Sequence, residues 1–339
     1  MHVLVTGAAG FIGSNFVRHW VREHPADDVV AFDLLTYAGS LTNLSDVEDE
    51  ITFVHGDIGD LELVADVLDR AAIDVIVNFA AESHNSLAVL DPARFLRTNV
   101  LGTQTLLEAA HRRGIARFHH ISTCEVYGDL ALDDPGAFTE ASPYRPRTPY
   151  NASKAAADHV VRAYHETFGV PVTISNCSNN YGPYQFPEKV VPFFTTLAID
   201  DRPLPLYAST DHRREWLHVL DHCAAVERIV LDGVDGETYN VGSGREATIV
   251  EIADLVLDTL GKPAGLKTIV PDRPGHDRRY LLDATKIRRE LGWEPEIDFD
   301  TGLRATVEWY AANRAWWEPL LDRAPVVETA WSTGPAAAR

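Results

Sequence analysis

The sequence predicts an α/β fold, a Rossmann-type doubly wound parallel sheet followed by a smaller C-terminal lobe. Three observations support this prediction. A short apolar strand at the N-terminus runs into a glycine-rich turn, apolar runs then alternate with helical patterns, and this alternation stops after about residue 182. The chain has 339 residues, which is enough for one large domain or two moderate ones.

The expected strands are short, β-branched and almost continuously apolar, which is typical of parallel strands buried on both faces. They lie at residues 2–6, 29–32, 51–55, 74–81, 118–122 and 172–175. Helical patterns fall between them, at residues 14–23, 61–71, 94–113 and 149–168. This alternation predicts right-handed crossovers between parallel strands.

The second half of the chain is less regular. Residues 179–187 combine Gly, Pro and aromatic side chains, so we expect an irregular binding loop there. We place the first domain at residues 1–182, with part of 215–245 returning to it, and the smaller lobe at 183–323. The Ala-rich end, residues 324–339, is expected to be a flexible tail.

The glycine-rich turn has the form G-x-x-G-x-x-G, with Gly7, Gly10 and Gly13 between a strand and a helix. Glycines there permit a tight turn and a close approach of the backbone to a pyrophosphate, which the free N–H groups of the helix N-terminus can bind. The second strand ends in Asp33. An acidic residue at that place suits the ribose 2′-hydroxyl of NAD and repels the 2′-phosphate of NADP.

A Tyr-x-x-x-Lys pair, Tyr150 and Lys154, lies in the fourth expected helix, where both side chains share one face about one turn apart. A lysine ammonium there should favour the phenolate and lower the pKa of the tyrosine. Earlier in the chain a hydroxyl, a thiol and a carboxylate are adjacent, at Thr123, Cys124 and Glu125. Together with the dinucleotide turn, these residues predict an oxidoreductase site that carries additional acid and base groups.

The composition argues against several other classes of protein. The formal net charge of −20 disfavours a nucleic-acid partner, because phosphate binding needs basic patches. The three cysteines have neither disulfide-framework nor zinc-ligand spacing, so no metal site is expected. We see no signal peptide, and no apolar run approaches the ~20 residues of a membrane span. We therefore expect a cytoplasmic protein that does not associate with membranes.

Taken together, the motifs resemble those of nucleotide-sugar dehydratases in the extended short-chain dehydrogenase/reductase superfamily, and most of all the dTDP-glucose 4,6-dehydratase family. The resemblance covers roughly residues 1–319 and implies that the smaller lobe binds a nucleoside-diphosphate sugar, that NAD is the cofactor, and that helices 94–113 and 149–168 form a homodimer. The motifs that carry it are residues 6–13, 33–39, Ala80-Ala81-Glu82-Ser83-His84, Glu125-Val126-Tyr127-Gly128, 150–154, 179–189 and Arg273-Pro274-Gly275-His276-Asp277.

The resemblance also implies a role for each catalytic residue. Tyr150 takes the proton of the sugar 4-hydroxyl while hydride moves from C4 to NAD⁺, Thr123 holds that hydroxyl, and Lys154 binds the nicotinamide ribose. Glu125 removes the C5 proton, which the 4-keto group has made acidic. In the family an aspartate beside this glutamate protonates the departing C6 hydroxyl, and the hydride then returns to C6.

The chain departs from the family pattern at two places. The family's run Ser-Thr-Asp-Glu is Ser-Thr-Cys-Glu in this chain, so Cys124 stands where the general acid is expected. A thiol with a pKa near 8.5 is mostly protonated at neutral pH and can donate a proton, although Cys124 could also be a space-filling side chain. After His84 the family has Val-Asp-Arg-Ser, whereas this chain has Asn85-Ser86-Leu87-Ala88, so a charged pair near the sugar is missing.

The remaining site residues follow from the resemblance position by position. Cationic members of the set would supply the local positive charge that suits phosphate. We expect the dinucleotide to contact Gly7, Gly10, Phe11, Ile12, Gly13, Asp33, Asp57, Ile58, Ala80, Ala81, Tyr150 and Lys154. We expect the nucleotide sugar to contact Ser83, His84, Asn180, Lys189, Pro205, Tyr207, Arg214, Asn240, Arg273 and His276.

The expected function is NAD-dependent 4,6-dehydration of dTDP-glucose or another NDP-hexose through a 4-keto intermediate, in deoxysugar biosynthesis. Other reactions that share the 4-keto step stay open: those of a 5,6-dehydratase, a 4-epimerase and a uronate decarboxylase. A non-catalytic nucleotide-binding sensor is a more distant alternative, which the intact Tyr150, Lys154 and Glu125 disfavour. The sequence determines neither the base, nor the sugar, nor the product.

Overall fold

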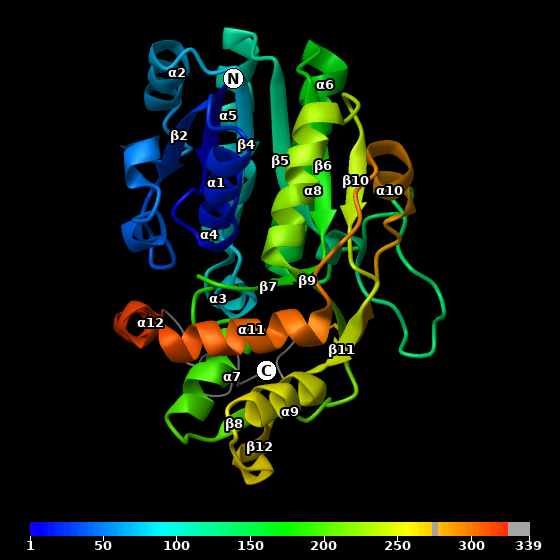
Figure 1. Cartoon of the computed structure of the whole chain (residues 1–339). Helices are drawn as coiled ribbons and strands as arrows, with labels where there is room; N and C mark the ends of the chain where they lie inside the picture. The colour runs from blue at the N-terminus through cyan, green and yellow to red at the C-terminus, as the bar shows by residue number, and fades with distance from the viewer. Residues whose placement is uncertain (273–276, 325–339) are drawn as a thin grey trace.

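The computed structural model describes residues 1–272 and 277–324, and its larger part is built on one parallel sheet (Figure 1). Its seven strands are β1 (His2–Thr6), β2 (Asp28–Asp33), β3 (Ile51–His55), β4 (Val75–Asn78), β5 (Arg117–Thr123), β6 (Val172–Cys177) and β10 (Thr238–Val241). They lie in the order β10-β6-β5-β4-β1-β2-β3, and every neighbouring pair is parallel. The strand order reverses between β1 and β4, which confirms the doubly wound sheet.

Helices cover both faces of this sheet. One face carries α2 (Leu61–Arg70), α5 (Thr103–Arg113) and α6 (Pro149–Phe168), and the other carries α1 (Phe11–Glu23) and α8 (Val219–Asp232). Each face buries its own apolar core, so the β-branched strands are covered on both sides. Helix α6 starts at a capping Thr148, whose hydroxyl accepts the Asn151 N–H, and it ends at Gly169 in the left-handed conformation.

The smaller part lies beyond the carboxyl ends of the large sheet, below it in Figure 1. Its strands are β7 (Asn179–Tyr181), β9 (Arg213–His218), β11 (Glu246–Thr248) and β13 (Arg279–Tyr280), with β8 (Leu204–Tyr207) paired to β12 (Lys267–Val270). Its helices are α7 (Val190–Ile199), α9 (Ile249–Thr259), α11 (Phe299–Ala312) and α12 (Arg314–Leu321). A separate apolar cluster joins α7, α9 and α11.

Shorter elements connect these parts. They include α3 (Asn85–Leu90), α4 (Pro92–Phe95), α10 (Thr285–Leu291) and 3₁₀ turns at Leu41–Asn43, Glu48–Glu50, Cys124–Tyr127 and Ala264–Leu266. Although α8 and β10 come from the second half of the sequence, α8 packs on the large sheet and β10 extends it beside β6.

The structure refines one sequence-based expectation about local structure and contradicts another. The helix expected at residues 94–113 contains a π-helical segment, Leu96–Gly102, between α4 and α5. The loop expected at 179–187 begins with a regular element, because Asn179–Tyr181 pairs as a parallel strand with Trp216–His218 of β9. A three-residue strand is too short for a sequence pattern to distinguish it from a loop.

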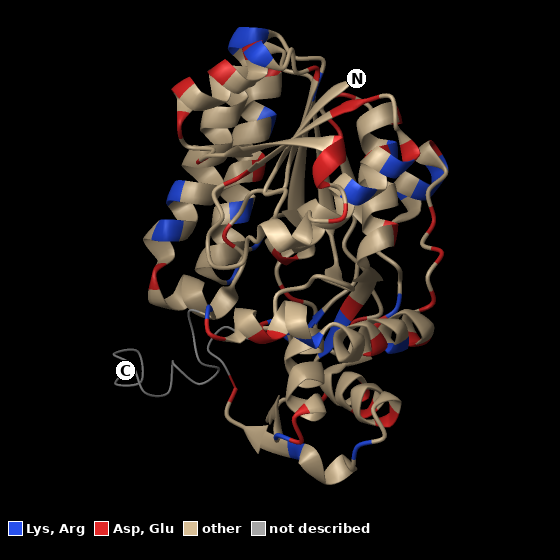
Figure 2. Ribbon diagram, turned by 60° about the vertical axis from the view of Figure 1, so that its left-hand side comes forward, with Lys and Arg blue, Asp and Glu red and all other residues tan. Residues whose placement is uncertain are grey.

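Acidic and basic residues are both spread over the molecule, and some Lys and Arg lie where the two parts meet (Figure 2). No described helix is long and apolar enough to cross a membrane. The tail expected at 324–339 lies outside the described residues apart from Ala324, and so do the expected substrate contacts Arg273 and His276.

Candidate active site

Most of the expected site residues lie at or beyond the carboxyl ends of β1, β2, β4, β5 and β6, on one edge of the large sheet. In open α/β sheets this edge, at the point where the strand order reverses, is where ligands bind. The strands thus bring together four segments that are far apart in the sequence: the glycine-rich turn, the Ala80–Ala81 pair, the Thr123 turn and the Tyr150 helix.

The glycine-rich turn after β1 packs closely against neighbouring backbone. Gly7 has φ +65°, and a Cβ atom on it would lie 2.7 Å from the Ala80 backbone nitrogen. A Cβ on Gly13 would lie 2.1 Å from the Gly7 carbonyl oxygen. Helix α1 begins at Phe11 and its N-cap residue, Gly10, offers no side-chain cap, so the first N–H groups of the helix are available to an anion.

Asp33 closes the other side of this turn. Its carboxylate accepts hydrogen bonds from the Ala9 N–H at 2.9 Å and the Leu35 N–H at 2.7 Å. Burial raises the pKa of Asp33, and these two hydrogen bonds oppose that shift. A fixed carboxylate beside a glycine cradle fits a dinucleotide with a free ribose hydroxyl, so the residues present fit NAD. Asp57 and the buried Ile58 follow β3, and Ala80 and Ala81 follow β4.

Thr123, Cys124 and Glu125 lie where β5 ends and a tight turn begins. Thr123 is the last residue of β5, and its hydroxyl caps the 3₁₀ turn Cys124–Tyr127 by accepting the Glu125 N–H at 3.3 Å. The Tyr150 side chain is buried and hydrogen-bonds with Thr123. Thr123, Glu125 and Tyr150 therefore form one group, as the sequence predicts.

The expectation that Lys154 lowers the pKa of Tyr150 is wrong for this arrangement. Burial, followed by the negative charge of Glu125, raises the pKa of the Tyr150 phenol well above its usual value. The Lys154 ammonium is directed elsewhere: it donates to the Ile121 carbonyl at 2.6 Å and lies 3.3 Å from Nε2 of His120. Burial lowers the pKa of Lys154 to about 8.

Cys124 lies inside the protein, with 1% of its surface exposed. It packs in an apolar cluster that includes Val126, Tyr127, Tyr280 and Leu282. Burial, together with the nearby negative charge of Glu125, raises the pKa of the thiol well above its usual value. The thiol is therefore protonated at neutral pH, but it is a weaker acid than an exposed cysteine.

Glu125 has a partner that the sequence reasoning missed. The Asn85 amide donates to Glu125 Oε2 at 3.1 Å, and its carbonyl oxygen accepts from the Thr148 hydroxyl at 3.0 Å. Because Thr148 caps the helix that carries Tyr150, Asn85 links the carboxylate to the start of α6. The sequence identified Asn85 only as a departure from the family pattern, and nothing in its spacing indicates this contact.

The residues expected to hold the nucleotide sugar fall into two groups. Lys189 donates to the Ser83 carbonyl at 2.9 Å, and Nε2 of His84 lies 3.4 Å from the buried carboxyl of Glu188, so these residues form one wall beside the site. Pro205 and Tyr207 lie in β8 and Arg214 in β9, in the smaller part of the structure.

Three of the expected substrate contacts are already occupied by protein groups. Asn180 Oδ1 interacts with His222 at 3.0 Å, and the Arg214 guanidinium donates to the carbonyls of Asp277 and Arg278. Asn240 has no exposed surface, and its amide bonds to Tyr127, Phe138 and Asp283, so it supports the loop around Tyr127. Among the described residues, no group of three or more His, Cys, Asp or Glu could hold a metal ion.

Comparisons with known proteins agree with this geometry. Residues 4–306 match the sequence model of a family described as GDP-mannose 4,6 dehydratase. A dTDP-glucose 4,6-dehydratase from Streptomyces niveus is 50% identical over 326 residues, covering 94% of this chain and 96% of the relative. One from Mycobacterium tuberculosis is 50% identical over 323 residues, covering 95% and 97%.

Two solved structures superpose on nearly the whole chain. A dTDP-glucose 4,6-dehydratase from Streptomyces venezuelae, with NAD and dTDP bound, superposes with a TM-score of 0.91 at 49% identity, covering 94% of this chain and 100% of that one. A UDP-glucose 4-epimerase from Thermotoga maritima, with UDP-glucose, superposes with a TM-score of 0.87 at 28% identity, covering 93% and 100%.

Proposed function

Because the chain belongs to the dTDP-glucose 4,6-dehydratase family, we propose that it catalyses the NAD-dependent 4,6-dehydration of dTDP-glucose, as a lyase of deoxysugar biosynthesis. The observation that carries this proposal is the near full-length identity of 50% combined with the grouping of Thr123, Glu125 and Tyr150 beside a dinucleotide cradle. A non-catalytic sensor would have no need of this grouping.

The first stage is oxidation of the sugar at C4. Bound NAD supplies the hydride acceptor for C4 and later the hydride donor for C6. Tyr150 takes the proton of the 4-hydroxyl, and the Thr123 hydroxyl holds the same oxygen in place. Because burial holds the pKa of Tyr150 high, this tyrosine needs a cation close by when it gives up its own proton. We assign that role to Lys154, one turn along α6, whose ammonium would have to turn toward the phenol from the Ile121 carbonyl that it contacts in this structure.

The second stage is loss of water across C5 and C6. The 4-keto group acidifies the C5–H, and Glu125 takes that proton while Asn85 holds its carboxylate. The C6 hydroxyl leaves as water after receiving a proton, for which the adjacent Cys124 thiol is our proposed donor. Hydride then adds at C6 and Glu125 returns its proton to C5, which gives a 4-keto-6-deoxy sugar. The proton gained by Tyr150 and the one lost by Cys124 are exchanged with water.

The smaller part of the structure is the proposed nucleotide-sugar lobe, residues 183–323, apart from the segment within 215–245 that joins the dinucleotide-binding domain, residues 1–182. Lys189, His84 and Ser83 lie where one wall of the site meets this lobe. We assign Asn180, Pro205, Tyr207, Arg214 and Asn240 to substrate binding on the basis of family position. For Asn240 that role is through support of the Tyr127 loop.

We also propose a homodimer located in the cytoplasm. The helical region from α4 to α5, together with α6, exposes large apolar side chains that a second copy could cover. Leu96 is 50% exposed, Leu101 59% and Phe168 50%. Two exposed leucines and an exposed phenylalanine on these neighbouring helices favour an interface between protomers.

Incubation with dTDP-glucose and other NDP-sugars, followed by mass and NMR analysis of the products, tests the proposal. The expected product has lost one water and carries a 4-keto group and a C6 methyl. An exocyclic C5–C6 alkene would instead identify a 5,6-dehydratase. An unchanged mass with inverted C4 would identify an epimerase, and loss of carbon dioxide from a uronate would identify a decarboxylase.

A further inference from the structure

The Tyr-x-x-x-Lys pair is the first half of a longer stripe on α6. Tyr150, Lys154, Asp158 and Arg162 recur every four residues, which places all four side chains on one face of the helix. The first two belong to the proposed active site. Asp158 has no exposed surface, and a buried carboxyl is rare unless other groups compensate it, so its place beside Lys154 requires an explanation.

The side chain between Lys154 and Asp158 is that of His120, on β5. Its Nε2 lies 3.3 Å from Lys154 Nζ and 3.5 Å from Asp158 Oδ1. Asn78 donates from its amide nitrogen to Nδ1 of His120 at 3.2 Å, because the Asn78 oxygen already accepts from the Thr6 hydroxyl. Burial lowers the pKa of His120 well below its usual value, so the ring is neutral and carries its proton on Nε2.

Asp158 is fixed in the orientation that faces this histidine. Its Oδ2 accepts hydrogen bonds from the Ser122 hydroxyl at 2.8 Å and the Tyr144 hydroxyl at 2.9 Å. Its Oδ1 makes no hydrogen bond and is left facing the N–H edge of His120. Burial raises the pKa of Asp158, whereas Lys154, Ser122 and the hydrogen bond from Tyr144 oppose that shift.

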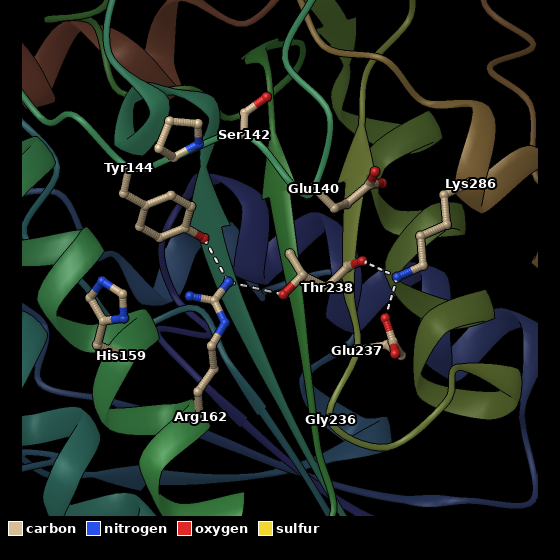
Figure 3. Close-up of a pocket in the computed structure, with 10 residues that line it drawn as sticks. Glu140, Ser142, Tyr144, His159, Arg162, Gly236, Glu237, Thr238 and Lys286 are labelled. Atoms are coloured by element: carbon tan, nitrogen blue, oxygen red, sulfur yellow. Dashed lines mark hydrogen bonds and ion pairs between the residues drawn. The ribbon is translucent and has the colours of Figure 1, made fainter. Parts of the chain in front are cut away.

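The outer end of the stripe reaches a surface cavity of about 420 Å³ beside the start of β10 (Figure 3). Figure 3 shows Arg162 donating to the Tyr144 hydroxyl, at 2.9 Å, and to the Thr238 hydroxyl, at 3.1 Å. The polar contacts are therefore continuous from this cavity to Lys154. The titratable or charged groups that face Lys154 or Asp158 are Arg162 on α6, His120 on β5, Tyr127 on the turn after β5, Cys177 on β6 and Tyr144 on the loop before α6.

We propose that Asp158 is a positioning residue for the dehydratase reaction: its negative charge, on the far side of His120, is the counter-ion that keeps the buried Lys154 charged. This inference rests on the proposed function of Lys154. Without a counter-ion, burial would remove the lysine proton, because a low-dielectric surrounding disfavours the charged form. A neutral Lys154 could neither stabilise the phenolate of Tyr150 nor hold a ribose hydroxyl as strongly.

The sign of the expected pH effect follows from these contacts. The pKa of Lys154 is about 8, and the Asp158 charge is the largest influence that raises it against burial. Replacing Asp158 with Asn removes that charge, so Lys154 loses its proton at a lower pH. A nearby opposite charge typically shifts a pKa by about 1–3 units. The alkaline limb of kcat should therefore move down by about one unit or more.

The test compares the pH dependence of Asp158→Asn with that of the wild type, using dTDP-glucose and the purified holoenzyme. We expect a lower alkaline limb, partial recovery of kcat on acidification and little change in KM. A second readout is independent of turnover: calorimetric titration of nucleotide-depleted protein with NAD⁺. In this titration, the affinity of the variant for NAD⁺ should begin to weaken at a lower pH than the affinity of the wild type does.

Asp221→Asn is the matched control. Asp221 is a carboxylate on α8 that is also buried, though less completely than Asp158, and it accepts the backbone N–H groups of Glu296 and Ile297, outside the stripe. Its removal should lower stability without moving either pH profile. If Asp158→Asn does not fold, Tyr144→Phe replaces it, since loss of one donor to the carboxylate should shift both profiles in the same direction by less.

The possible outcomes distinguish a failure of the counter-ion role from a failure of the proposed function. Profiles of folded Asp158→Asn, or of Tyr144→Phe in its place, that coincide with the wild type would overturn the counter-ion role. Equal shifts in Asp158→Asn and Asp221→Asn would also overturn it, because the effect would then be one of general destabilisation. A wild-type protein that turns over no NDP-sugar would refute the proposed function instead, while the NAD⁺ titrations would still test the counter-ion role.

Discussion

Replacing Cys124 tests the proton donor that we propose for loss of the C6 hydroxyl. If the thiol protonates the leaving C6 hydroxyl, Cys124→Ala should still allow oxidation at C4 but should stall before water is lost. Cys124→Asp should keep or raise the rate of dehydration. A carboxyl at this buried position, beside Glu125, would have a raised pKa and would hold its proton at neutral pH, while still being a stronger acid than the thiol.

The expected effect of Cys124→Ala on the rate can be distinguished from an effect on stability. The Cys124 side chain is 1% exposed, so its truncation removes packing worth on the order of 1 kcal/mol, out of a total stability of about 5–15 kcal/mol. The protein should therefore stay folded. General-acid catalysis typically contributes about 10²–10⁴ in rate, so a catalytic thiol would leave Cys124→Ala at least about a hundredfold slow.

The assay mixes enzyme with dTDP-glucose and follows the absorbance of enzyme-bound NADH together with the product. Cys124→Ala should accumulate the reduced cofactor, because the 4-keto sugar cannot lose water. Cys124→Ala that turns over at the wild-type rate would show that the thiol only fills space and that water or Glu125 protonates the leaving group. A different product from Cys124→Asp would refute 4,6-dehydration as the natural reaction.

Three further predictions concern separate parts of the structure. Asn85→Val removes the hydrogen bond to Glu125, which at about 1.5 kcal/mol should lower kcat roughly tenfold with little change in KM, as steady-state kinetics would show. Asp33→Asn removes the fixed carboxylate, so we expect weaker NAD⁺ binding and a smaller preference over NADP⁺ in parallel titrations; unaltered selectivity would exclude this role. Leu101→Asp places a charge on the exposed helical surface, and light scattering should then report a monomer, whereas an intact dimer would locate the interface elsewhere.

The arrangement of the large sheet could be predicted because its determinants are local. Continuous β-branched runs mark buried parallel strands, and the spacing of Gly7, Gly10 and Gly13 marks the first turn whatever the rest of the chain does. The predicted helix 149–168 coincides with α6, because a capping Thr148 and a terminal Gly169 bound it in the sequence itself. Local signals of this kind do not depend on how distant segments meet.

The electrostatics of the site could not be predicted in the same way. The four-residue spacing places Lys154 beside Tyr150, but it does not reveal that both side chains are buried, and for Tyr150 burial outweighs the lysine. Asp158 was within reach of the same reasoning, since it continues the four-residue spacing of Tyr150 and Lys154. His120, in contrast, contacts the stripe from strand β5, and no pattern in the sequence predicts that contact.

The two departures from the family pattern meet at one carboxylate, although they lie about forty residues apart. Cys124 precedes Glu125 in the chain, and Asn85 donates directly to its Oε2. With a thiol in place of the family's aspartate, Glu125 has lost a neighbouring carboxyl that could share its proton. It accepts a hydrogen bond from the Asn85 amide, which holds the carboxylate in one orientation. The glycine turn and Asp33 keep the family pattern, so both departures lie beside the residue to which we assign proton transfer at C5. We therefore expect Asn85→Val and Cys124→Asp to be non-additive in kcat: the carboxyl restored at position 124 should offset part of the loss caused by removing the amide, and simple additivity of the two effects would show that the sites act independently.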